Sequence, residues 1–501
     1  MDFLQHLGLG AAVALTASNM LYCFIGCLVG TLIGVLPGLG PIATISILLP
    51  ITFGLDPIGA LIMLAGIYYG AQYGGSTTAI LLRIPGEANS VVTVIDGYAM
   101  AEQGRAGIAL GIAAIGSFIA GCIATLFIAA VGSPLATIAI RFSAASYFSL
   151  MLMGLVFAVT LSHGSVVKSL AMTILGLLLS TIGTDIATAG TRRLTFGSEY
   201  LDSGINFSLL AMGLFGIGEI LKNLGQTEEA ESTTAGIGRI LPSWSDIRNS
   251  LGAILRGTGI GMFLGILPGS GAVISPFASY SVEKRISRTP EKFGHGAIQG
   301  VAGPESANNA AAQTCFIPLL TLGLPASAVM ALMIGAMTLQ GITPGPNVMN
   351  SRPDLFWGMI VSMWVGNLFL IIINLPLVRV WVALLKVPYR ILFPAIIVFC
   401  CMGAYTINNS TDDVMMLAVF GLLGFAFSKF SFEPAPLLLG FVLGSMIEDN
   451  LRRSLIMSQG DMAVFFKEPL SLALLIITAI LLIFTISPKL RTNRNNIFQG
   501  D

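Results

Sequence analysis

Two long apolar stretches of the chain end in almost the same pattern. Residues 30–40 and residues 261–271 both read G-x-x-x-G-[VI]-L-P-G-x-G. Proline lacks a backbone donor and glycine permits a positive φ, so each Pro-Gly-x-Gly predicts the end of a helix with free backbone polar groups. In the hydrocarbon of a membrane, such a break is stable only where protein encloses it or where it lines a cavity. Two breaks in corresponding halves therefore predict a transporter binding site.

A short apolar run follows each break, over residues 42–53 and residues 272–282. About twelve helical residues rise only ~18 Å, which is less than the ~30 Å hydrocarbon core of a membrane. We therefore expect each run to be one arm of a re-entrant hairpin or half of a broken helix, and not a full span.

Longer apolar runs predict membrane helices on both sides of a polar segment, residues 223–249. This linker divides the chain into a first membrane repeat, residues 1–222, and a second membrane repeat, residues 250–501. The runs predicted to be helical are 8–36 with a break near 16–19, 58–82, 107–131, 146–162, 165–183, 205–221, 328–342, 356–376, 391–407, 412–428, 434–448 and 469–487.

The two halves match at an offset that drifts along the chain. Pro37 lies 231 residues before Pro268, whereas Pro85 lies 240 residues before Pro325. Extra sequence around residues 284–293 supplies much of the difference, as expected for an insertion into a loop of one copy.

The charge of the corresponding loops predicts that the two repeats are inverted in the membrane. The loop after the second short arm carries Lys284, Arg285, Arg288 and Lys292, whereas residues 51–57 carry no cation. Because basic loops favour the cytoplasm, the two loops are expected on opposite sides. Cations flank both ends of the run at 469–487, so the number of spans stays open.

Composition identifies the class of protein. The chain is 55% hydrophobic and 10% charged, whereas soluble domains carry about 25% charged residues, so we expect an all-α polytopic membrane protein in a lipid bilayer. The net charge of zero gives no sign of a nucleic-acid partner. The six cysteines lack a C-x-x-C pair, and the three histidines stand apart, so we expect no cofactor and no metal beyond a coupling Na⁺. No hydrolase or P-loop motif is present, and we do not expect an enzyme.

Side-chain candidates for a binding site lie beside the apolar runs. Gly74 and Gly75 with Ser76, Thr77 and Thr78 predict an unwound, hydroxyl-rich segment, although Ser and Thr also bond back to carbonyls of their own helix. Glu305, Asn308 and Asn309 follow a Gly-Pro predicted to break a helix, and ionisable groups inside a membrane domain are functional candidates. The alternative for Glu305 is a plain helix cap in polar solvent.

The two Pro-Gly-x-Gly loops offer backbone chemistry. Free N–H groups at the start of a half-helix attract carboxylates, and unwound carbonyls coordinate a cation. The predicted substrate contacts are therefore Pro37, Gly38, Leu39, Gly40, Gly269, Ser270 and Gly271, together with Ser76, Thr77, Thr78, Asn308 and Asn309. The predicted contacts of the coupling cation, Na⁺ or H⁺, are Gly38, Gly74, Gly75, Gly269 and Glu305.

Arg83 is the cation nearest to the first break, and it could meet an anionic substrate. Because it ends its apolar run, we instead expect its side chain to reach towards the membrane interface.

At these residues the chain closely resembles the large membrane subunit of the tripartite tricarboxylate transporter family. The resemblance extends over nearly the whole chain. Its most specific stretches are residues 30–41, 73–88, 96–98, 261–271, 304–309, 317–325, 342–346 and 440–453.

The resemblance implies a multi-pass protein of the bacterial inner membrane that imports organic carboxylates by symport with a cation. It also implies two partners, a small four-helix membrane subunit and a periplasmic solute-binding protein, and an elevator-type motion. The alternative is a passive anion channel or an exporter built on the same broken helices. A membrane enzyme acting on a lipid carrier would need a catalytic constellation that the sequence does not display.

Overall fold

The computed structural model describes residues 3–36, 40–161, 165–185, 188, 190–224, 238–267, 271–346, 348–384 and 389–486. Helices make up nearly all regular structure in these ranges, and a small β-hairpin is the exception. Five helical stretches of the described residues are long and apolar enough to cross a membrane: Ala17–Gly34, Ala106–Ala139, Phe207–Leu224, Pro353–Asn374 and Thr411–Lys429.

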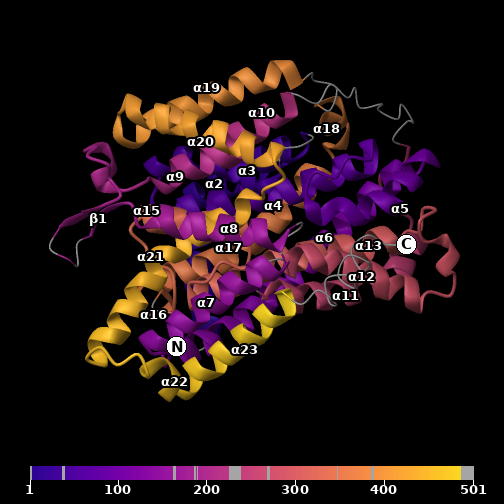
Figure 1. The fold of residues 1–501 in the computed structure, drawn as a ribbon. Helices are drawn as coiled ribbons and strands as arrows, with labels where there is room; N and C mark the ends of the chain where they lie inside the picture. Colours follow the sequence, from indigo (N-terminus) through magenta and orange to yellow (C-terminus); the bar gives the residue numbers. More distant parts are fainter. Residues whose placement is uncertain are drawn as a thin grey trace.

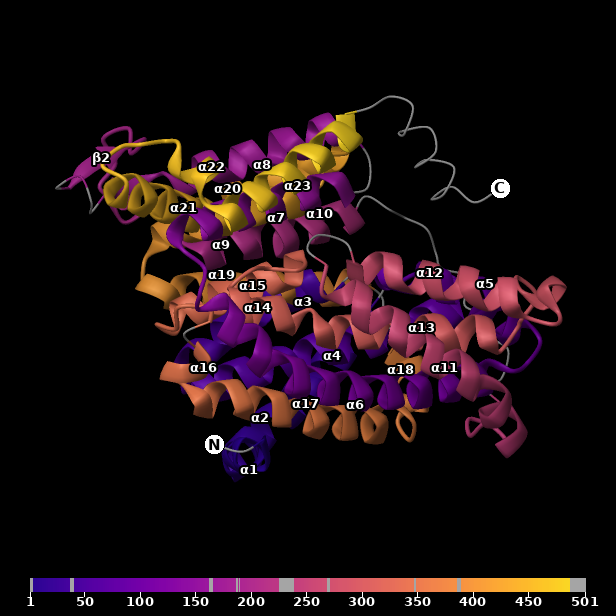
Figure 2. The same ribbon diagram turned by 90° about the horizontal axis from the view of Figure 1, so that it is seen from below.

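The helices pack in two layers, which lie one above the other in Figure 2. The first layer takes from the first half of the chain α1 (Phe3–Ala14), α2 (Ala17–Gly34), α3 (Pro41–Leu48), η1 (Leu49–Gly54), α4 (Pro57–Leu82), η2 (Ala88–Ser90), α5 (Val91–Glu102) and α6 (Ala106–Ala139). It takes from the second half α11 (Trp244–Gly265), α12 (Gly271–Ile286), η6 (Pro290–Lys292), α13 (Gln299–Thr314), α14 (Phe316–Leu322), α15 (Ala328–Leu339), α16 (Val348–Ser351), α17 (Pro353–Asn374) and α18 (Val378–Leu384).

The second layer is also built from both halves. Its first-half elements are α7 (Ala144–Leu161), α8 (Val166–Ser180), β1 (Gly183–Asp185), β2 (Thr191–Arg193), η4 (Tyr200–Ser203), α9 (Phe207–Ala211), the π-helix η5 (Met212–Ile217) and α10 (Gly218–Leu224). Its second-half elements are α20 (Thr411–Lys429), α21 (Pro434–Met457), α22 (Val464–Lys467) and α23 (Pro469–Ile486). Helix α19 (Tyr389–Asn408) contacts both layers, through α3 and α20 (Figure 1).

One helix pair recurs in both halves of the first layer. In α2, Gly30 packs on the carbonyl oxygen of Ile67 in α4, and a Cβ added to Gly30 would lie 2.3 Å from it. In α11, Gly261 packs on the carbonyl oxygen of Ala307 in α13, where an added Cβ would lie 2.2 Å away. The glycines one turn before and after make the same contacts: Gly26 with Met63, Gly34 with Ala71, Gly257 with Gly303, and Gly265 with Ala311. Small residues thus let both helix pairs approach to backbone contact.

The extra residues of the second half lie where the sequence predicts them. Facing residues of the recurring pair are 37 positions apart in the first half and 46 apart in the second. Helices α12 and α13 are joined by a loop that contains η6, whereas only two residues separate η1 from α4. The predicted insertion near residues 284–293 is therefore confirmed. The inversion of the repeats stays a prediction.

Both short runs form short helical segments, and their re-entrant character stays a prediction. The first arm consists of α3 and η1 and ends at Gly54, and the second arm, α12, continues to Ile286. The boundary predicted between Thr16 and Asn19 is also present, because Thr16 caps α2 by accepting a bond from the Asn19 N–H.

Two predicted helix breaks are wrong. Helix α4 runs without interruption through Gly74 and Gly75, and α13 runs through Pro304. The glycines of α4 serve close packing instead of unwinding, since a Cβ added to Gly74 would lie 2.6 Å from the backbone nitrogen of Val35. Proline removes one bond from the helical ladder, and burial of the neighbouring turns in α13 keeps the rest of that helix intact.

Candidate functional site

Helix α13 carries a polar face into the interior of the first layer. Its residues from Gly300 to Thr314 are all buried, and Glu305, Asn308 and Asn309 are among them. The helix contacts α4, α5 and α6 of the first half and α11 and α12 of its own half. The polar face therefore lies where the two halves of the chain meet.

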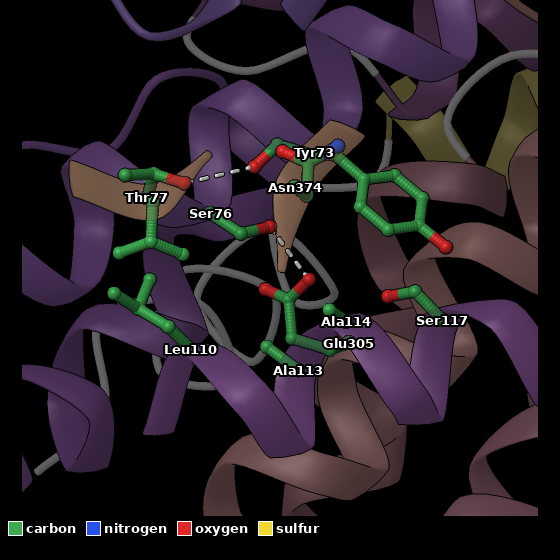
Figure 3. Close-up of a pocket in the computed structure, with 10 residues that line it drawn as sticks. Tyr73, Ser76, Thr77, Leu110, Ala113, Ala114, Ser117, Glu305 and Asn374 are labelled. Carbon is green, nitrogen blue, oxygen red and sulfur yellow. Dashed lines mark hydrogen bonds between the residues drawn. The ribbon is translucent and has the colours of Figure 1, made fainter. Parts of the chain in front are cut away.

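The Glu305 carboxyl group is the centre of this face. Its side chain is 1% exposed, and it accepts a hydrogen bond from the Ser76 hydroxyl of α4, at 2.6 Å (Figure 3). It also accepts a hydrogen bond from the Thr93 hydroxyl of α5. Both donors are neutral. A buried carboxylate is costly unless a positive charge or a proton neutralises it, so this group is suited to holding a cation.

The two asparagines point to different surroundings. The Asn309 amide donates to the Ser117 hydroxyl of α6, at 2.7 Å, and to the Glu305 carbonyl, at 3.0 Å. The Asn308 side chain faces the Glu87 carboxyl group, which follows the end of α4. Although the Asn308 amide lies close to this carboxyl group, neither of its amide atoms makes a hydrogen bond of regular geometry among the described residues.

Other buried polar atoms near this face also lack partners within the described part of the chain. They are both amide atoms of Gln72, the hydroxyls of Tyr69 and Tyr73, and one carboxyl oxygen of Glu87. Unpaired buried polar groups are rare in folded proteins and call for an explanation such as a ligand, an ion or water. Because these atoms gather along α4, this region is the candidate binding site.

A narrow pocket opens beside Glu305 (Figure 3). It lies between α4, α6, α13, the end of α17 and the start of α18. Its lining residues are Tyr73, Ser76, Thr77, Leu110, Ala113, Ala114, Ser117, Glu305, Asn374 and Val378. The pocket places hydroxyl, amide and carboxyl oxygens around one small space.

The structure brings some of the predicted site residues together and separates others. Ser76 and Glu305 are in direct contact, and Thr77 lines the same pocket. Thr78 instead bonds back to the Gly75 carbonyl, at 2.8 Å, as expected from the alternative interpretation of this segment. Because α4 is continuous there, the free carbonyls predicted at Gly74 and Gly75 do not form.

The two Pro-Gly-x-Gly loops are described only at their ends. Pro37, Gly38, Leu39, Pro268, Gly269 and Ser270 lie outside the described residues. Gly40 is the N-cap of α3, without a side-chain capping bond, and lies against Gly86 and Glu87. Gly271 is buried as the first residue of α12, and α12 contacts η2, which follows Glu87. Both short arms therefore touch the segment that contains Glu87.

Arg83 does not take part in the site. It ends α4 in a left-handed conformation with φ of 58°, its side chain is exposed, and its guanidinium lies 5.7 Å from the ring centre of Tyr98. Among the described residues, no lysine or arginine side chain is buried. By contrast, Glu305 and four other aspartate or glutamate side chains are buried. The site region is thus acidic and has no buried base.

Sequence reasoning missed Thr93, Ser117 and Glu87. Thr93 and Ser117 lie in helices whose local sequence shows no motif typical of a binding site. No pattern in the sequence indicates their contacts with α13. Glu87 follows Pro85 and Gly86, and this repeats the Pro-Gly signal already used for the two loops. That signal could have found it.

A strongly apolar, multi-helix chain with a buried acidic polar cluster is typical of membrane transport proteins. Residues 20–439 match the Tripartite tricarboxylate transporter TctA family. The chain belongs to this family of transporter membrane subunits, which is not a family of enzymes.

Two relatives come from Agrobacterium vitis. One, an uncharacterized 52.8 kDa protein of the TAR-I ttuC' 3' region, is 55% identical over 501 residues, which are 99% of this chain and 99% of the relative. The other, an uncharacterized protein of the TAR-II ttuC' 3' region, is 57% identical over 241 residues, which are 48% of this chain and 100% of the relative. No solved structure matches the chain.

Proposed function

We propose that this chain is the permease of a three-part system that imports organic carboxylates across the bacterial inner membrane with a coupling cation, Na⁺ or H⁺. A periplasmic solute-binding protein supplies the substrate, and a small four-helix membrane subunit completes the permease. The name of the family supports a tricarboxylate or a similar anion as the substrate.

One observation carries the coupling part of the proposal. Glu305 is buried at the junction of the two halves and is held only by the neutral hydroxyls of Ser76 and Thr93. No buried basic side chain of the described residues can balance its charge or attract an anion. An organic anion therefore enters this region only together with positive charge, which a coupling cation at Glu305 supplies.

We further propose that the two repeats are inverted and that the first layer moves against the second in an elevator-type motion. Each half of the chain contributes helices to both layers, as such a division requires. Contacts between the layers involve α3 and α15, which pack on η5, α9 and α21. The Pro-Gly-x-Gly loops remain the predicted tips that meet the substrate, alongside Asn308 and Asn309.

The coupling role is tested by a matched pair of threonine substitutions. Thr93→Val removes the hydroxyl that bonds to Glu305, whereas Thr125→Val removes a buried hydroxyl that bonds only to Gly121 of its own helix. Hydrogen bonds to charged groups contribute about 1.5–3 kcal/mol, which corresponds to roughly a ten- to hundredfold change in affinity. We expect Thr93→Val to shift the half-saturating concentration of the coupling cation by this factor in proteoliposomes with the binding protein and the small subunit.

The controls decide between the candidate functions. Thr125→Val should retain the wild-type cation dependence. Uptake that runs only down the substrate gradient, with no response to a sodium or proton gradient, would establish a passive channel instead. An unchanged cation dependence in Thr93→Val, at normal expression, would remove Glu305 from the coupling step.

A further inference from the structure

The segment that contains Glu87 is a meeting point of the two halves. Gly86 lies against Gly75 of α4, and a Cβ added to Gly86 would lie 2.3 Å from the Gly75 Cα. This close approach holds the Glu87 side chain beside α4 and opposite Asn308 of α13. Gly40, the N-cap of α3, packs on the same segment. A Cβ added to Gly40 would lie 3.9 Å from the Glu87 Cβ.

Three polar atoms at this point have no partner among the described residues. They are the Nδ2 and Oδ1 atoms of Asn308 and the Oε1 atom of Glu87. Asn308 is 0% exposed, so water of the bulk solvent does not reach its amide. Each unpaired buried polar group costs about 1–3 kcal/mol, which a ligand that pairs with it would recover.

The N-terminal end of a helix packs on the same segment. Helix α3 has eight residues, begins at Pro41, and has no side-chain capping bond at Gly40. Its first N–H groups have no carbonyl partner within the helix, and the N-terminal end of a helix attracts anions. An uncapped helix end next to an unpaired amide donor is an arrangement that suits a carboxylate group.

The charge of Glu87 decides how such a carboxylate can bind. In the described part of the chain, the titratable groups that interact with Glu87 are Glu305 from α13 and Tyr68 from α4, and neither supplies a positive charge. An ionised Glu87 would repel the substrate. In its acid form, Glu87 instead donates its O–H hydrogen to a substrate carboxylate oxygen.

We propose that the acid form of Glu87 and the Asn308 amide bind one carboxylate group of the organic anion, so that the substrate is bound together with a proton. The inference rests on the proposed function, and it assigns to Glu87 a role separate from that of Glu305. Linkage requires that substrate and proton raise each other's affinity by the same factor. The half-saturating substrate concentration then rises about tenfold per pH unit above the pH at which Glu87 loses its proton.

The experiment measures exchange of radiolabelled succinate and citrate in proteoliposomes with the complete transport system. The pH is varied upwards from about 7, where free carboxyl groups of this type are ionised. Glu87→Gln keeps a hydrogen-bond donor that cannot be lost with rising pH, whereas Glu87→Ala removes the donor. Glu102→Gln, which changes an exposed acid on α5, is the matched control.

We expect Glu87→Gln to exchange substrate with an affinity that no longer depends on pH, and to lose accumulation driven by a proton gradient. Glu87→Ala should bind at least tenfold more weakly than Glu87→Gln at every pH, and Glu102→Gln should behave as wild type. Wild-type pH dependence in Glu87→Gln would overturn the inference. The inference would also fail if Glu87→Gln lost exchange as completely as Glu87→Ala while keeping wild-type thermal stability. That result would identify Glu87 as a cation site. Absence of exchange in the wild type, by contrast, would refute the proposed function itself.

Discussion

Asp96 joins the two halves of the chain more tightly than any other described side chain of the first layer. It lies in α5, is 0% exposed, and its Oδ1 atom accepts the N–H groups of Gly294, Gly296 and Ala297 at 2.8–2.9 Å. Its Oδ2 atom accepts the hydroxyl of Tyr280, at 3.0 Å. One carboxylate of the first half thus closes the loop between α12 and α13 of the second half.

The cost of changing Asp96 follows from this geometry. Hydrogen bonds to a charged group contribute about 1.5–3 kcal/mol each, and neutral ones about 0.5–1.5 kcal/mol. Asp96→Asn keeps an oxygen for the three N–H groups but loses their charge assistance and the acceptor for the Tyr280 hydroxyl, which together cost roughly 2–4 kcal/mol. Asp96→Ala leaves three buried N–H groups unpaired, and we expect it to cost about 4 kcal/mol or more. Tyr280→Phe removes one bond and should cost only about 1–2 kcal/mol.

The assay is thermal unfolding of the four purified proteins in one detergent, followed by uptake in proteoliposomes. The expected order of stability is wild type, Tyr280→Phe, Asp96→Asn and Asp96→Ala. Thr93 lies one turn before Asp96 and donates to Glu305, so Asp96→Asn should also alter the dependence of uptake on the coupling cation. A wild-type melting temperature for Asp96→Ala, or equal values for the alanine and asparagine variants, would refute this account of the contact.

Two further predictions use glycines as matched pairs. Gly261→Ala should destabilise the protein by at least about 1–3 kcal/mol, because its Cβ would lie 2.2 Å from the Ala307 carbonyl oxygen, whereas Gly259→Ala in the same helix meets nothing within 4 Å and should be neutral or stabilising. Equal melting temperatures of the two variants would contradict the backbone contact between α11 and α13. Gly86→Ala should weaken substrate exchange severalfold by displacing Glu87 from α4, whereas Gly75→Ala, whose Cβ would meet only contacts of 3.5 Å or more, should exchange normally. The opposite order of the two exchange rates would exclude this role for Gly86.

The recurring helix pair could be predicted because both halves keep the same local pattern. The spacing of Gly30 and Gly34, and of Gly261 and Gly265, encodes the backbone contact of one helix pair in each half. The insertion in the second half could be placed for the same reason, since it changes the offset between matching prolines. Signals of this kind are local in sequence and can be interpreted without knowing which helices contact each other.

The helix breaks at Gly74 and at Pro304 were predicted wrongly because local propensity is a weak guide in a tightly packed membrane interior. A glycine that weakens an isolated helix also permits an interhelical contact, and Gly74 does so against α2. The sequence does not reveal which of the two effects prevails. The answer depends on a neighbouring helix about forty residues away in the chain.

The contacts of Glu305 could be predicted only in part. Its hydroxyl partners are 229 residues away, at Ser76, and 212 residues away, at Thr93. Ser76 stood out because it lies in a cluster of hydroxyl residues, whereas Thr93 lies in a helix without any such cluster. Long-range pairs of this kind follow from how the two halves dock, and a local pattern carries no information about docking.

The acidic character of the site also suggests how movement of the anion or the cation alone would be prevented. An anion that arrives alone meets the carboxyl groups of Glu305 and Glu87 with no buried base of the described residues to offset them. Moving an unneutralised charge into such a region is costly, because no nearby positive group repays the loss of hydration. A cation that arrives alone neutralises Glu305 but leaves the Asn308 amide and the uncapped end of α3 without the anion that suits them. Under the proposed function, occupation by both partners is therefore the state of lowest cost, and the arrangement of a few buried polar groups would couple them without a separate gate.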